Sequence, residues 1–228
     1  MKICKLSEVF AVNENITAEK VGNIVIIHNL YKDYTKIREY FLHQPWPISE
    51  TDGPTENGVN YIKCAQMSIR FRGYPFSDIV SKVIKEAYDK ITKHSYNAIR
   101  TLIFQQKIDN ISEFGQIHRD ESNSPNEAFT VLTYLNTEEE CSGGTAFFPM
   151  MEFSEKYSQV NFWSSEPSHK TNDCVKIKMK PGHTIIFNSC EYHAVWLPEN
   201  KWYNVPRITM VSRFVTEEFV KRHGLSTP

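Results

Sequence analysis

The sequence predicts one α+β domain whose C-terminal half is a double-sheet sandwich or jelly roll. The first observation is length, since 228 residues suit one large domain better than two small ones. The second is a change of pattern near residue 98, where mixed helical and strand patterns give way to short β-type runs separated by turn residues. The third is the lack of any repeat, low-complexity tract or Pro/Gly/Ser-rich linker that would divide the chain.

We therefore expect a single domain over residues 1–228, organised in three parts. Residues 1–97 are predicted to form a support of helices and strands, with the helices at the N-terminal side of the core. Residues 98–214 are predicted to form the β core, and residues 215–228 a C-terminal tail.

The first part contains three predicted elements and one long loop. Residues 22–28 are rich in β-branched side chains and predict a strand, and residues 33–42 predict a short amphipathic helix. Residues 44–61 hold three prolines and two glycines, which predicts a loop. A longer helix is expected over residues 77–94, with apolar side chains at helical spacing at Val80, Val83, Ile84, Ala87 and Ile91.

The second part consists of strands, with one interruption. Residues 154–173 are polar and long enough for a lid over a site. Residues 44–61 and the aromatic-rich residues 196–203 are further candidates for lid and substrate contacts. Seven strands are expected, over residues 98–104, 129–135, 145–148, 174–179, 184–187, 193–197 and 207–214.

Composition excludes several classes of protein. Lys and Arg number 26 against 27 Asp and Glu, so the net charge of −1 supplies no general field for nucleic acid. No apolar run approaches the roughly 20 residues of a membrane span, and residues 1–22 lack a secretory signal pattern. Five cysteines without a C-x-x-C pair fit a reducing compartment, so a cytoplasmic location is expected.

Three side chains suggest a metal site. His118 and Asp120 are two residues apart, so both leave the same face of an extended segment. His193 begins a predicted strand and supplies a third ligand. Two histidines and one carboxylate leave open positions on a six-coordinate ion, as in non-haem Fe(II) oxygenases, whereas a closed zinc site needs a fourth ligand. With eight histidines in the chain, a chance grouping is the competing interpretation.

Two arginines lie on a predicted core strand. Arg207, Thr209, Val211 and Arg213 alternate, so they share one face. A buried guanidinium is costly unless it meets an anion, and a dicarboxylate bound to the metal at one end would present a carboxylate at the other. The competing interpretations are a strand-end residue that reaches solvent for Arg207 and a surface or salt-bridge role for Arg213.

From His118 to Phe214 the chain resembles the Fe(II)- and 2-oxoglutarate-dependent dioxygenases, particularly their prolyl hydroxylase-like branch. The order and spacing of several motifs carry the resemblance: His118-Arg-Asp120, Phe129-Thr-Val-Leu-Thr-Tyr134-Leu-Asn136, Gly143-Gly144-Thr-Ala-Phe-Phe-Pro149, Pro181-Gly182-His-Thr-Ile-Ile-Phe187, His193 and Arg207-Ile-Thr209. The resemblance covers a little under half of the chain and implies a double-stranded β-helix (jelly-roll) core.

The resemblance also implies roles for single residues. His118, Asp120 and His193 would bind Fe(II) and form the catalytic centre. Arg207 would bind the distal carboxylate of the cosubstrate 2-oxoglutarate, with Thr209 as its hydroxyl neighbour. Tyr134 stands where the prolyl hydroxylase-like branch has a tyrosine that bonds the same carboxylate, although an ordinary cross-strand aromatic is an equal alternative.

The implied reaction uses O2 and 2-oxoglutarate, releases succinate and CO2, and hydroxylates a protein or peptide side chain, or else a small molecule. Two alternatives stay open. Arg207 and Arg213 also resemble the paired arginines of nucleic-acid demethylases of the superfamily, which would make Arg213 a second cofactor-binding residue, but no basic groove is evident. A non-catalytic jelly-roll binding module with a vestigial metal site is the other alternative.

Overall fold

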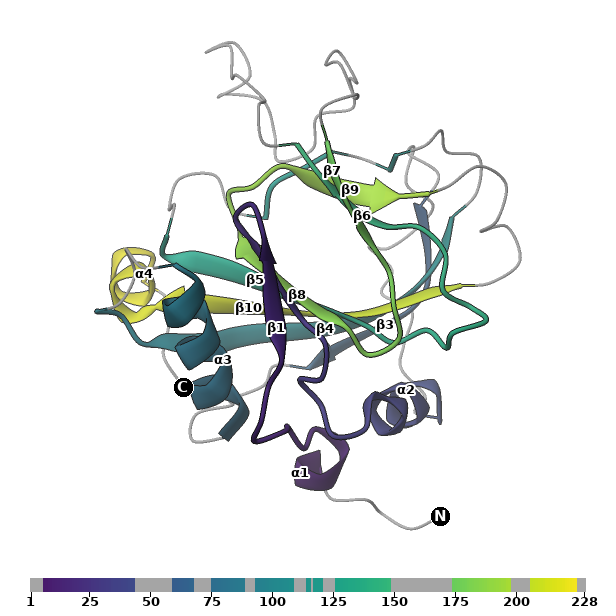
Figure 1. The fold of residues 1–228 in the computed structure, drawn as a ribbon, viewed down its shortest axis with the longest axis horizontal. Helices are drawn as coiled ribbons and strands as arrows, with labels where there is room; N and C mark the ends of the chain where they lie inside the picture. The colour runs from purple at the N-terminus through teal and green to yellow at the C-terminus, as the bar shows by residue number, and fades with distance from the viewer. Residues whose placement is uncertain are drawn as a thin grey trace.

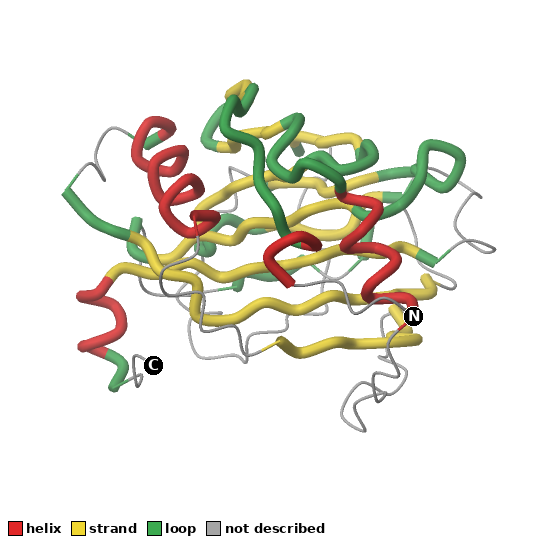
Figure 2. Tube along the Cα trace, turned by 90° about the horizontal axis from the view of Figure 1, so that it is seen from below, coloured by secondary structure: helices red, strands yellow, loops and turns green. Residues whose placement is uncertain are grey.

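Two antiparallel β-sheets and a set of flanking helices make up the protein (Figure 1). The computed structural model describes residues 6–43, 59–67, 75–88, 93–108, 114–115, 117–120, 126–148, 174–197 and 206–224. The sheets face each other, and helices lie across the outer face of the larger sheet (Figure 2). This arrangement confirms the predicted α+β fold with a double-stranded β-helix core.

The larger sheet has seven strands, and all neighbouring strands are antiparallel. Near the middle of this sheet, the strand that carries Arg207 and Arg213 pairs with the strand that ends at Tyr134. The strands follow the spatial order β1 (Ala18–Val21), β2 (Ile24–Ile27), β8 (Thr184–Asn188), β5 (Ala128–Tyr134), β10 (Arg207–Thr216), β4 (Tyr96–Ile108) and β3 (Val59–Met67).

The smaller sheet has three strands, in the order β7 (Val175–Lys178), β6 (Gly144–Phe147) and β9 (His193–Trp196). Isolated bridges from Phe114 to Trp196 and from His118 to His193 add a further stretch of chain beside β9. The segment that carries His118 is therefore held at the edge of the smaller sheet.

Four helices are present among the described residues: α1 (Leu6–Val9), α2 (Tyr34–His43), α3 (Pro75–Ala87) and α4 (Glu217–Arg222). The apolar faces of α2 and α3 are buried through Ile37, Phe41, Val80 and Ile84. At the start of α4, the Thr216 hydroxyl accepts a hydrogen bond from the backbone N–H of Phe219 at 3.1 Å. In the part of the chain that the structure describes, no helix is long and apolar enough to cross a membrane.

The larger sheet separates two apolar layers, and strand alternation decides which residues enter each layer. On β5, Phe129 and Val131 pack with the helices, whereas Leu132 and Tyr134 pack between the sheets. All seven residues of β5 are buried, which explains why its sequence is almost continuously apolar. The layer between the sheets is where the inner face of β10 meets the smaller sheet.

The predicted strands of the core are all present, with ends that differ by a few residues. The helix expected over residues 77–94 ends at Ala87. Residues 1–97 do not only support the core from outside, because their strands β1, β2 and β3 belong to the same sheet as the core strands. The expected tail, residues 215–228, contains the end of β10 and the helix α4.

A Gly144→Ala substitution should destabilise the smaller sheet, because Gly144 lies on its central strand. A Cβ at this position would lie 1.9 Å from the backbone oxygen of Ile177. We expect the free energy of unfolding, measured with chemical denaturant, to fall by at least about 2 kcal/mol. Gly22→Ala is the control, since its φ is +59° but no atom lies within 4 Å of the added carbon, and strain alone should cost about 1 kcal/mol. An equal loss in both variants would contradict the packing described here.

Candidate metal centre

Backbone pairing brings His118 and His193 together. The N–H of each residue donates to the carbonyl oxygen of the other, both at 2.9 Å. In such a hydrogen-bonded antiparallel pair, the two side chains leave the same side of the backbone. The imidazole rings accordingly lie with their centroids 4.3 Å apart. Strand geometry then directs Asp120, two residues after His118, toward the same space.

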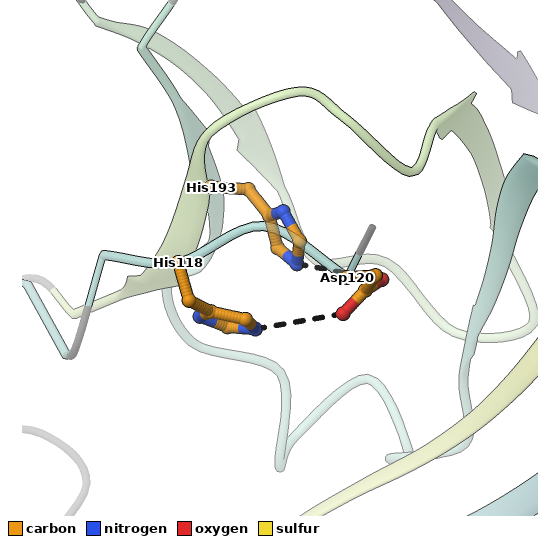
Figure 3. A group of neighbouring side chains, drawn as sticks. All are labelled: His118, Asp120 and His193. Carbon is orange, nitrogen blue, oxygen red and sulfur yellow. Dashed lines mark ion pairs between the residues drawn. The ribbon is translucent and has the colours of Figure 1, made fainter. Parts of the chain in front are cut away.

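The three side chains converge on one point (Figure 3). The ligand atoms of His118, Asp120 and His193 all lie within 4.8 Å of one another. The Nε2 atoms of His118 and His193 lie 3.7 and 3.8 Å from the two carboxylate oxygens of Asp120. Atoms that bind one ion at about 2.1 Å lie at most about 4.2 Å apart, and both nitrogen–oxygen separations fall within this limit. A small closure of the group would let all three ligands bind a single first-row metal ion. Among the described residues, no other group of this kind is found.

A backbone carbonyl orients His193. Its Nδ1 lies 2.9 Å from the carbonyl oxygen of Glu191, which can only accept, so Nδ1 carries the proton. The unprotonated Nε2 then faces Asp120 with its lone pair. The ring of Phe187 meets the His193 ring edge-on at 4.7 Å and fixes its plane.

Burial controls the charge of His193. The residue is 6% exposed, and this burial, with repulsion from the neighbouring His118, lowers the pKa of His193 to about 4. The ring is therefore neutral at pH 7, which is the form that binds metal.

The Asp120 carboxylate is held as an anion. The Thr130 hydroxyl on β5 donates to Oδ2 at 2.5 Å and lies 3.0 Å from the Ser189 hydroxyl. Burial alone would raise the pKa of the carboxyl. The two imidazoles, the Thr130 hydrogen bond and the Arg213 guanidinium outweigh it and hold the pKa of Asp120 below its ordinary value.

A buried cation lies elsewhere on the same inner face. Arg207, the first residue of β10, is 3% exposed and donates from Nη1 to Oε1 of Gln106 at 3.0 Å. Its guanidinium carbon lies 5.8 Å from the centre of the Tyr134 ring. Burial raises the pKa of Tyr134. The charge of Arg207 and its hydrogen bond to the phenol lower this pKa by less than burial raises it, so the phenol stays protonated. The Tyr134 hydroxyl lies 2.8 Å from the hydroxyl of Thr145.

The backbone around Arg207 is fixed by Asn136. The Asn136 side chain donates to the carbonyl oxygen of Pro206 at 2.9 Å and accepts from the N–H of Ile208 at 2.7 Å. These bonds lie on both sides of Arg207. Glu140, which pairs with Arg38 of α2 at 2.7 Å, also contacts the Asn136 amide at 3.4 Å.

The predicted inner face of β10 is present. Val211 packs in the layer between the sheets, and Thr209, which is buried, lies opposite Tyr134 in register. Arg213 lies opposite Thr130, beside the metal ligands, with its guanidinium carbon 5.4 Å from the Phe219 ring. Arg207 and Arg213 are six residues apart, about 20 Å along the strand, so they lie toward different ends of the inner face of β10.

Several contacts of the site have no signal in the sequence. Gln106, Thr130 and Ser189 are ordinary polar residues in or beside strands, and only the register between strands reveals their partners. Of the expected lid segments, residues 154–173 lie outside the described residues, and most of 44–61 and 196–203 do so as well.

Several solved structures of enzymes resemble the fold of this chain. A prolyl hydroxylase from Trichoplax adhaerens, in complex with a hypoxia inducible factor peptide fragment, matches with a TM-score of 0.51 and 15% identity, over 90% of this chain and 88% of that chain. The 2-oxoglutarate-dependent epimerase SnoN from nogalamycin biosynthesis has a TM-score of 0.54 and 11% identity, over 85% and 78% of the two chains. The carbocyclase SnoK of the same biosynthesis has a TM-score of 0.52 and 11% identity, over 85% and 79%.

No protein-family model matches the chain, and no curated protein matches it. At these identities the structural matches establish the double-stranded β-helix fold. The group formed by His118, Asp120 and His193 is an independent observation on this chain.

Removing the Thr130 hydroxyl should weaken metal binding, because the Asp120 carboxylate would lose the donor that orients it. We expect Thr130→Val to lower Mn(II) affinity about tenfold or more, measured by titration followed by electron paramagnetic resonance. Thr130→Ser keeps the hydroxyl and should bind Mn(II) nearly as tightly as wild type. Wild-type affinity in Thr130→Val would show that the hydroxyl does not position the ligand.

Proposed function

We propose that the protein is an Fe(II)- and 2-oxoglutarate-dependent oxygenase that hydroxylates a side chain of a protein or peptide. One observation carries the proposal: the His118, Asp120 and His193 group and the buried cation Arg207 lie on the same interior of a double-stranded β-helix. The first supplies a facial set of metal ligands, and the second supplies a partner for an anion.

The three ligands suit Fe(II) in charge and number. Two neutral imidazoles and one carboxylate leave a net charge of +1 on a bound divalent ion and three open positions. A bound iron would supply the redox chemistry that couples oxidative decarboxylation of 2-oxoglutarate, to succinate and CO2, to hydroxylation of the substrate by O2. The Glu191 carbonyl holds His193, and the Thr130 hydroxyl holds Asp120, in the orientation that binding requires.

Arg207 is the proposed partner of the distal carboxylate of 2-oxoglutarate. Its guanidinium is buried and can bind a carboxylate with two parallel hydrogen bonds. Tyr134 lies against it with a protonated hydroxyl, and Thr209 lies opposite Tyr134, so both can border the same carboxylate. Arg213 is proposed to act at the metal end of the cosubstrate, because its charge acts on Asp120 and it lies opposite Thr130 in register.

The substrate class is proposed from the similar structures and from the charge of the chain. A peptide is bound in the similar Trichoplax prolyl hydroxylase, whereas SnoN and SnoK belong to antibiotic biosynthesis. The near-zero net charge of this chain disfavours a nucleic-acid substrate. A reducing, cytoplasmic environment is part of the proposal, on the ground that the five cysteines of the sequence include no C-x-x-C pair.

The cosubstrate reaction can be tested without a known substrate. Wild-type protein, loaded with Fe(II) without oxygen and then exposed to air, should form succinate from 2-oxoglutarate. Asp120→Ala and Arg207→Ala should each lower the rate at least about tenfold, because one loses a metal ligand and the other the anion partner. Lys82→Ala is the control, since this side chain on α3 is 77% exposed. If the wild type neither formed succinate nor was stabilised against heat by Mn(II) with 2-oxoglutarate, the non-catalytic binding module would be the better interpretation.

The substrate class calls for a separate screen. Peptides, small molecules and single-stranded oligonucleotides would be incubated with the Fe(II) protein and 2-oxoglutarate, and products would be followed by mass spectrometry. We expect peptides to gain one oxygen atom and to raise succinate formation, with neither effect in Asp120→Ala. Oxidation of oligonucleotides or small molecules, with peptides unchanged, would overturn the peptide assignment.

A further inference from the structure

Gln106 lies at the buried Arg207, although it belongs to a different strand. On β4, Gln106 is directly opposite Arg207 in register, so the two side chains leave the same face of the sheet. The Gln106 side chain is also buried, at 6% exposure. A carboxamide in such a position is costly unless its polar atoms find partners.

The chemistry of the pair fixes the orientation of the amide. A guanidinium has donors only, so the atom that faces Arg207 Nη1 at 3.0 Å is the amide oxygen of Gln106. The amide nitrogen then points away from Nη1 and keeps two N–H donors. Within the described part of the chain, the bond from Arg207 is the one hydrogen bond of this side chain.

The remaining donors of Gln106 lie beside Arg207, the proposed partner of the distal carboxylate. A carboxylate has about four lone-pair sites, and Arg207 occupies at most two of them in a bidentate pair. A neighbouring neutral donor can fill another site without adding charge. A buried carboxylate with a full set of donors is held more strongly than one with a single partner.

We propose that Gln106 donates from its amide nitrogen to the distal carboxylate of the 2-oxo acid cosubstrate and so makes the site selective for a dicarboxylate. This inference rests on the proposed function. Gln106 acts twice, because its oxygen holds the guanidinium of Arg207 and its nitrogen binds the same anion that Arg207 binds. The amide nitrogen of Gln106 adds no binding affinity for a 2-oxo acid without the second carboxylate, such as 2-oxobutyrate.

The test compares the affinities of two ligands in the Mn(II)-loaded protein, by calorimetry. Gln106→Glu keeps an oxygen for Arg207 but removes both N–H donors and adds a negative charge toward the ligand. We expect its affinity for 2-oxoglutarate to fall about 10- to 100-fold, with that for 2-oxobutyrate within about twofold of wild type. Gln105→Glu is the matched control, since the neighbouring side chain points to the other face of β4.

The outcomes separate the inference from the proposed function. A wild-type protein that fails to bind 2-oxoglutarate with Mn(II) overturns the proposed function. A wild type that binds it, together with Gln106→Glu that binds it equally well, overturns this inference alone. Equal losses for both ligands would show that Gln106 does not make the site selective for a dicarboxylate and would also overturn this inference. If Gln106→Glu does not fold, Gln106→Met has similar length and no donors, and the same selective loss is expected.

Discussion

The candidate site depends on the pair of backbone hydrogen bonds between His118 and His193. These residues lie far apart in the sequence, and the segment with His118 runs beside β9, to which Phe114 and Gly115 also pair. The exchange of both N–H···O bonds sets the two imidazoles on one side, and the spacing from His118 to Asp120 brings the carboxylate there. Without this pairing, three polar side chains would reach the interior separately, and each would need its own partner.

A second constraint is the cost of charge inside the β-helix. Arg207 is buried and Asp120 is half-buried, so an isolated charge is strongly disfavoured at Arg207 and less so at Asp120. The protein supplies neutral hydrogen-bond partners to each: Thr130 to the carboxylate, and Gln106 and Tyr134 to the guanidinium. None of these partners neutralises Arg207. The Arg207 guanidinium carries its positive charge on the same interior as the metal ligands, which suits a ligand that is anionic at both ends.

The sequence was sufficient to predict the fold class, the three converging side chains and the inner face of β10. Each of these follows from a local pattern, either the two-residue spacing or strand alternation. The contacts of Gln106, Thr130 and Asn136 were not predictable, because they depend on which strand lies opposite and in which register. The short strand β1 and the strand β3 were also missed. β1 has three exposed residues and one partly buried residue, so it lacks the apolar pattern that marks a strand. Tertiary pairing decides such elements.

We propose that a metal ion held by the three ligands and the guanidinium of Arg207 form one site for a single ligand. The most direct test is a titration of 2-oxoglutarate into the wild-type protein, in the absence of oxygen, with and without one equivalent of Mn(II). If the ligand bridges the ion held by His118, Asp120 and His193 and the guanidinium of Arg207, binding should occur at one site per chain and require the metal. Binding of equal strength without metal, or no binding with it, would contradict the account.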